Sequence, residues 1–128
     1  MALLKDWEPW MQKLVREVIG WLHSWDNDID LAPRESRGDT RIGLIWHGRE
    51  NRFNIVCFNR LKSHFRIELL LPLRLAHEFE KELRDARLDS WYTDSNKRLN
   101  IPLTPAQFES HHKSLLPRLV RTTYEQAI

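Results

Sequence analysis

Apolar residues recur every three or four positions through the first 25 residues. This spacing matches the 3.6-residue period of an amphipathic helix. Asp6 is the expected N-cap, and Pro9 fits a first turn, where a backbone N–H has no helical acceptor. The apolar stripe consists of Leu4, Trp7, Met11, Leu14, Val18, Trp21 and Trp25.

From residue 41 the pattern changes to alternation, which is typical of strands with one buried face. Three successive stretches have it: "RIGLIW" (41–46), "FNIVCF" (53–58) and "HFRIELLL" (64–71). The polar residues between the first two include Gly48 and predict a hairpin turn. Pro72 ends the third strand, because proline cannot donate to a strand ladder.

The remaining residues predict a helix, a hairpin and a closing helix. Leu75, Phe79 and Leu83 mark the inner face of the first helix, and "RLDSWYTDSNKRLNIPL" has turn residues between two short strands. The last helix begins at "TPAQ" (104–107), the sequence of a capping box with proline at the first helical position. Pro117 is expected to kink or interrupt it.

The elements together predict an α+β fold. Their order is helix, three strands, helix, two strands, helix. Short connections favour an antiparallel sheet of about five strands, with the three helices on one face. At 128 residues the chain fits a single domain, 1–128, with an N-terminal helix (1–25) and a sheet-plus-helices body (41–128).

Composition excludes several protein classes. With 41% apolar and 30% charged residues the chain is typical of a globular protein. No apolar run approaches the roughly 20 residues of a membrane span, and the first residues lack a secretory leader pattern. Cys57 is the one cysteine, so no internal disulfide can form. We therefore expect a cytoplasmic protein without a membrane partner.

The charge is unevenly distributed, although the net charge is only +2. Residues 34–66 carry eight basic and three acidic side chains, whereas residues 1–33 carry three basic and six acidic ones. Clustered positive charge attracts phosphate groups. An ordinary solvated surface explains the same charges equally well.

Enzyme signatures are missing from the sequence. The four glycines form neither a Walker loop nor a GxGxxG array, and no serine lies in GxSxG. We expect no catalytic residues, no cofactor and no bound metal. A metal-dependent hydrolase built on His111, His112, Glu109 and His47 is an alternative, although adjacent helical residues point about 100° apart.

The polar face of the predicted sheet is the main candidate for a binding site. Basic side chains with an aromatic residue on an open sheet can hold a nucleic-acid backbone and stack a base. Every one-sided antiparallel sheet has a polar face, so a solvated surface is the competing interpretation. The candidate nucleic-acid-binding residues are Arg41, Trp46, His47, Arg49, Arg52, Arg60, Lys62, His64, Arg66, Trp91 and Arg98.

The tryptophan-rich first helix supports a second hypothesis from another class. Exposed aromatic side chains are common anchors of protein interfaces. Trp7, Trp10 and Trp21 would then bind a protein partner or a second copy of the chain.

Residues 41–124 also resemble a known group of domains. The matching stretches are "RIGLIW", "FNIVCF…FRIELLLPL", "AHEFEKEL", "RLNIPL" and the closing "LVRTTYEQA". In their order they look like small bacterial YjbR/MmcQ-like "double-wing" α+β domains, and like related domains appended to restriction-type proteins. The resemblance implies a DNA-binding or accessory module more than an enzyme. The leading hypothesis is therefore a non-enzymatic module that contacts nucleic acid or a nucleic-acid-processing protein.

Overall fold

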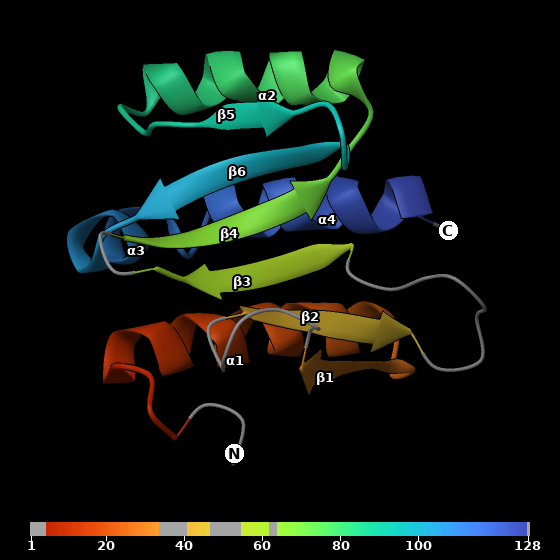
Figure 1. The fold of residues 1–128 in the computed structure, drawn as a ribbon, viewed down its shortest axis with the longest axis vertical. Helices are drawn as coiled ribbons and strands as arrows, with labels where there is room; N and C mark the ends of the chain where they lie inside the picture. Colours follow the sequence, from red (N-terminus) through yellow and green to blue (C-terminus); the bar gives the residue numbers. More distant parts are fainter. Residues whose placement is uncertain (1–4, 34–40, 47–54, 62–63, 128) are drawn as a thin grey trace.

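A single antiparallel sheet organises the fold. The computed structural model describes residues 5–33, 41–46, 55–61 and 64–127, and these form six strands in the order β1-β2-β3-β4-β6-β5 (Figure 1). All neighbouring strands are antiparallel. The strands are β1 (Ile29–Pro33), β2 (Arg41–Trp46), β3 (Val56–Arg60), β4 (Phe65–Leu70), β5 (Trp91–Thr93) and β6 (Arg98–Leu103).

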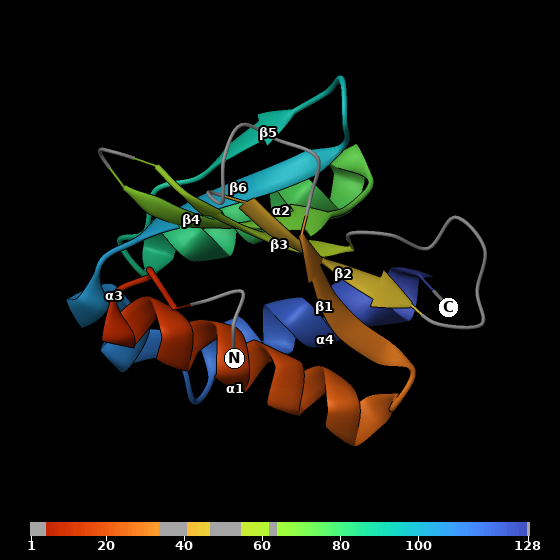
Figure 2. The same ribbon diagram turned by 60° about the horizontal axis from the view of Figure 1, so that its bottom comes forward.

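The helices lie on one side of this sheet, as Figure 2 shows. The described residues form α1 (Pro9–Trp25), α2 (Leu73–Asp85), α3 (Pro105–His111) and α4 (Leu115–Ala127). The predicted α+β class and the antiparallel sheet are confirmed. The described part of the chain has six strands and four helices, where about five and three were expected.

The core lies between the sheet and the helices. Phe58, Ile67 and Ile101 are register partners across β3, β4 and β6, so they form one row, and all three are buried. Leu14 of α1 and Leu119 of α4 belong to the same buried cluster. Inner-face positions recur at every second residue, because a strand turns successive side chains to opposite sides.

The sixth strand and the fourth helix of the described residues have separate causes. Ile29 is buried and pairs with Trp46, so the chain that follows α1 adds β1 to the sheet edge. The expected closing helix is divided into α3 and α4. Pro117 lies in the first turn of α4, where proline is tolerated, and the break comes before it.

The two predicted helix starts have different outcomes. At α3 the capping box is present: Thr104 Oγ1 accepts from Gln107 N at 3.2 Å, and Gln107 Oε1 accepts from Thr104 N at 3.0 Å. At α1 the expected cap at Asp6 is wrong. The helix begins at Pro9, and Glu8 occupies the cap without a side-chain hydrogen bond.

Two further observations concern the predicted protein interface at the tryptophans of the first helix and the predicted absence of a membrane partner. Trp7 is buried and meets Phe65 edge-on at 5.7 Å between ring centres, so it packs in the core, whereas the second hypothesis requires it to be exposed. Trp10 and Trp21 are partly buried and pack against the core. Among the described helices, none has the length and apolar character that crossing a membrane requires.

Candidate binding surface on the open sheet face

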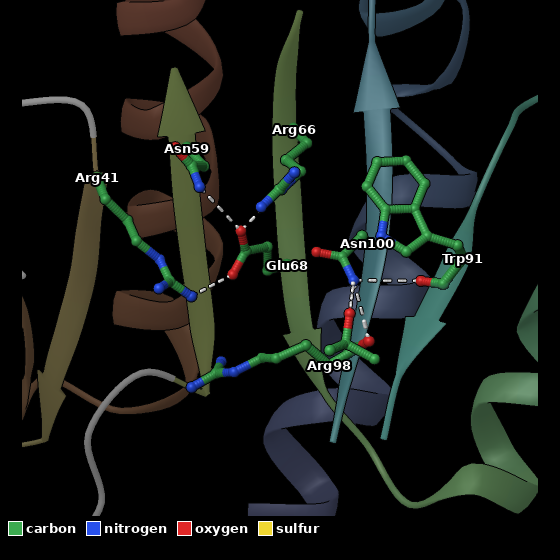
Figure 3. Close-up of polar contacts among 8 residues, drawn as sticks. Arg41, Asn59, Arg66, Glu68, Trp91, Arg98 and Asn100 are labelled. Atoms are coloured by element: carbon green, nitrogen blue, oxygen red, sulfur yellow. Dashed lines mark hydrogen bonds and ion pairs between the residues drawn. The ribbon is translucent and has the colours of Figure 1, made fainter. Parts of the chain in front are cut away.

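The side of the sheet opposite the helices carries a cluster of polar side chains. We call it the open sheet face and define it by Arg41, Asn59, Arg66, Glu68, Trp91 and Asn100 (Figure 3). Strand register brings these residues together from five strands. Glu68 pairs with Asn100 on one side and Cys57 on the other, and Arg66 and Arg41 both pair with Asn59. Trp91 pairs with Asn100 at the outer strand β5.

Glu68 is the centre of this cluster and is only 1% exposed. Its Oε2 accepts from Arg66 Nε at 2.9 Å and from Asn59 Nδ2 at 3.3 Å. Its Oε1 accepts from Arg41 Nη2. A buried charge is costly unless it is paired and hydrogen-bonded, and here both carboxylate oxygens have partners.

The partners of Glu68 also determine its ionisation. Burial alone raises the pKa of the Glu68 carboxyl, because desolvation penalises the charged form. The hydrogen bonds from Arg66 and Asn59 and the positive charges of Arg41 and Arg66 outweigh burial, so the pKa lies below its usual value. Glu68 is therefore a carboxylate at neutral pH.

The two arginines remain partly accessible while they are held. The side chains of Arg41 and Arg66 are 21% and 23% exposed. Two guanidinium groups beside one carboxylate leave one positive charge in excess on this cluster. Each guanidinium carries five N–H donors in a planar fork, so the bonds to Glu68 engage only part of its donor capacity.

Trp91 forms the outer end of the open sheet face. The residue is 39% exposed. The Arg66 guanidinium carbon lies 5.5 Å from the Trp91 ring centre, a cation–π distance, and the His64 ring meets it edge-on at 6.1 Å. An exposed indole is thus placed against a guanidinium that Glu68 orients.

Asn100 attaches the strand that carries this tryptophan. Its Nδ2 donates to Trp91 O at 3.3 Å, to Thr93 Oγ1 at 3.0 Å and to Arg98 O at 3.2 Å. β5 has only three residues, so these side-chain bonds add to a short ladder. The side chain of Asn100 therefore helps to fix the backbone of Trp91 against β6.

The structure brings four of the predicted nucleic-acid-binding residues together: Arg41, His64, Arg66 and Trp91. Arg98 extends over the same face but is only 7% exposed, so it offers a ligand little surface. Arg60 has a different environment, because its Nη1 donates to Asp6 O at 3.2 Å and its guanidinium lies 5.9 Å from the Trp7 ring centre. The remaining predicted positions, namely His47, Arg49, Arg52, Lys62 and the side chain of Trp46, lie outside the described residues.

Sequence reasoning did not identify Glu68 and Asn59 as members of the site. The available signal was the spacing of Arg66 and Glu68, two residues apart on one strand and therefore on one face. Asn59 and Arg41 come from other strands, and only the register places them beside the carboxylate.

The paired histidines do not form a metal site with the described residues. His112 Nδ1 lies 2.8 Å from Glu17 Oε1, and the His112 ring packs on Phe108 at 5.0 Å between ring centres. Within the described ranges, no three His, Cys, Asp or Glu side chains are grouped so that they could hold an ion. His112 thus connects α3 to α1.

A cavity of about 630 Å³ lies at one end of the sheet, away from the arginine cluster. It is mainly apolar, and Tyr92 in its wall donates from its hydroxyl to Leu71 O at 2.7 Å. Burial, and secondarily the charge of Asp94, raises the pKa of Tyr92. The lining residues are Ile55, Leu70, Leu71, Pro72, Leu73, Tyr92, Asp94, Lys97, Gln126 and Ala127.

Comparison with known proteins found no matching family model, no curated relative and no similar solved structure at a significant level.

Proposed function

We propose that this chain is a non-enzymatic module that binds nucleic acid on the open sheet face. The observation that carries the proposal is the contact between Arg66 and Trp91, an oriented guanidinium beside an exposed aromatic ring. Phosphate groups and base rings are the two chemical features that such a pair complements.

Glu68 supports this function by holding the arginines before a ligand arrives. A free arginine side chain loses rotamer entropy when it binds, whereas Arg41 and Arg66 are already positioned by hydrogen bonds to the carboxylate. Their remaining N–H donors match the geometry of phosphate oxygens. Pre-organisation therefore favours binding although Glu68 neutralises part of the positive charge.

The environment of Glu68 also favours binding over catalysis. A general base must reach the proton that it removes, within hydrogen-bond distance of the substrate. Glu68 is nearly inaccessible, and both of its oxygens already accept hydrogen bonds from Arg41, Asn59 and Arg66. Its lowered pKa makes it a weaker base still. The carboxylate thus acts as a support for the arginines.

A binding screen at low salt tests the proposal. Fluorescence anisotropy would measure the affinity for single-stranded and duplex DNA and RNA of mixed sequence. We expect binding to at least one of the four ligands and a weaker affinity in Arg66→Gln. Arg60→Gln is the matched control, since it removes the same charge from a residue held by Asp6 and Trp7. The proposal is overturned if folded wild-type protein binds none of the four.

A further inference from the structure

We infer that the ligand is a single strand and that one unpaired base stacks on Trp91. This inference rests on the proposed function and specifies how the open sheet face recognises its ligand. Three features carry it: the exposure and orientation of the indole, the position of the arginines relative to it, and the way a duplex hides its bases.

The indole of Trp91 is oriented as well as exposed. Arg66 lies at a cation–π distance from its ring, and the His64 ring stands at 82° to it. The peptide carbonyl of Trp91 accepts a hydrogen bond from the side-chain amide of Asn100. A ring contacted by two side chains, on a backbone that is itself hydrogen-bonded, loses less freedom on stacking than a freely rotating one. Its exposed surface is therefore a prepared platform for a flat apolar group.

The positive charges lie to one side of this platform. Register places Trp91, Asn100, Glu68 and Cys57 in one row across β5, β6, β4 and β3, and pairs Cys57 with Gly43 of β2. At about 4.8 Å between strands, the four steps from β5 to β2 cover roughly 19 Å. Arg66 and Arg41 follow Trp91 along this direction. A nucleic-acid backbone that crosses the strands would thus place a base on Trp91 and phosphates near the two arginines.

Base accessibility decides between a single strand and a duplex. In a duplex each internal base is stacked between its neighbours, so its ring face is not available to a protein side chain. An unpaired base can be splayed out and stacked on an aromatic ring. Duplex ligands could use the arginines but not Trp91. The exposed indole therefore favours a single-stranded ligand.

Variants of Trp91 with three ligands test this inference. Wild type, Trp91→Phe and Trp91→Ala would be titrated with a single strand, the corresponding duplex and a strand of the same length whose sugars lack bases. We expect Trp91→Ala to weaken single-strand binding about 10-fold or more, and Trp91→Phe to retain most of the affinity, because phenylalanine still offers a ring. The duplex and the base-free strand should bind the wild type more weakly than the single strand does. Trp91→Ala should bind these two ligands with the same affinity as the wild type. Thermal unfolding would verify that both variants fold.

The outcomes separate the stacking inference from the proposed function. Equal affinity of folded Trp91→Ala and wild type for the single strand would overturn stacking. A duplex that binds as tightly as the single strand would overturn it as well. If Arg66→Gln still weakens binding in either case, nucleic-acid binding on this face stands. If no ligand binds folded wild-type protein, the proposed function itself fails.

Discussion

Arg66 connects a buried carboxylate to an exposed aromatic ring. Its Nε donates to Glu68 Oε2 at 2.9 Å, and its guanidinium carbon lies 5.5 Å from the ring centre of Trp91. Arg66 and Glu68 are two residues apart on β4, so both side chains leave the sheet on the same face. Glu68 therefore affects the open sheet face without being accessible to a ligand.

Replacing Glu68 by glutamine should lower stability and change its dependence on pH. The lowered pKa of Glu68 in the folded state means that its stabilising effect is present above the unfolded pKa, near 4.5. That effect is lost as the pH falls from there through the lower folded value. At neutral pH, Glu68→Gln should reduce the free energy of unfolding by about 2–3 kcal/mol, because hydrogen bonds to a charged acceptor are replaced by weaker ones.

Urea unfolding of both proteins at several pH values would measure this difference. We expect the two curves of stability against pH to converge as the pH falls below about 4.5, because protonation then removes the same charge from the wild type. A stability difference that is independent of pH would contradict an ionised Glu68. Glu78→Gln, on the exposed surface of α2, is the control for a general carboxylate effect.

Replacing Gly20 by alanine should stabilise the protein. Gly20 lies inside α1 and is exposed, and no described atom outside its own helical neighbourhood lies within 4 Å of a Cβ placed there. Alanine in a helix interior is favoured over glycine by about 0.5–1 kcal/mol. Thermal or urea unfolding should show a gain of that size. A loss of stability would mean that α1 is not a regular helix at this position.

Replacing Trp7 by alanine should destabilise the fold strongly. Trp7 is buried against Phe65, and removing a buried tryptophan side chain costs about 3–5 kcal/mol. Trp21→Ala is the comparison. Trp21 is only partly buried, so its replacement should reduce the free energy of unfolding by less. If Trp7→Ala leaves the unfolding curve unchanged but alters the oligomeric state measured by sedimentation, Trp7 contributes to an interface between molecules and not to the core.

The outer parts of the site were predictable from local pattern, and its centre was not. "RIGLIW" and "RLNIPL" alternate clearly and correspond to β2 and β6 in full. Alternation along the strands placed Arg41 and Arg66 on the polar side of the sheet, and Trp91 was a candidate to join them. The contact of Arg41 with Glu68 joins residues 27 positions apart and depends on the register of β2, β3 and β4. That register follows from tertiary packing, which a pattern along one strand does not contain.

The boundaries of α4 and β1 illustrate the same limit. Pro117 indicates an interruption, but a proline is compatible with any position in a first turn, so the sequence alone does not fix where α4 begins. β1 is short and follows a polar turn. Its place in the sheet depends on pairing with β2, whose partner residues follow later in the chain, as in the pairs Pro33–Ile42 and Ile29–Trp46.

The chain provides an internal test of the proposed binding surface, because its described tryptophans lie on both sides of the sheet. Titrating ¹⁵N-labelled protein with a single-stranded oligonucleotide would follow each indole N–H by NMR. We expect the Trp91 signal to shift, together with backbone amides of β4 and β6, while Trp7, Trp10, Trp21 and Trp25 keep their positions. Shifts at the tryptophans of α1 with an unchanged Trp91 signal would contradict binding on the open sheet face.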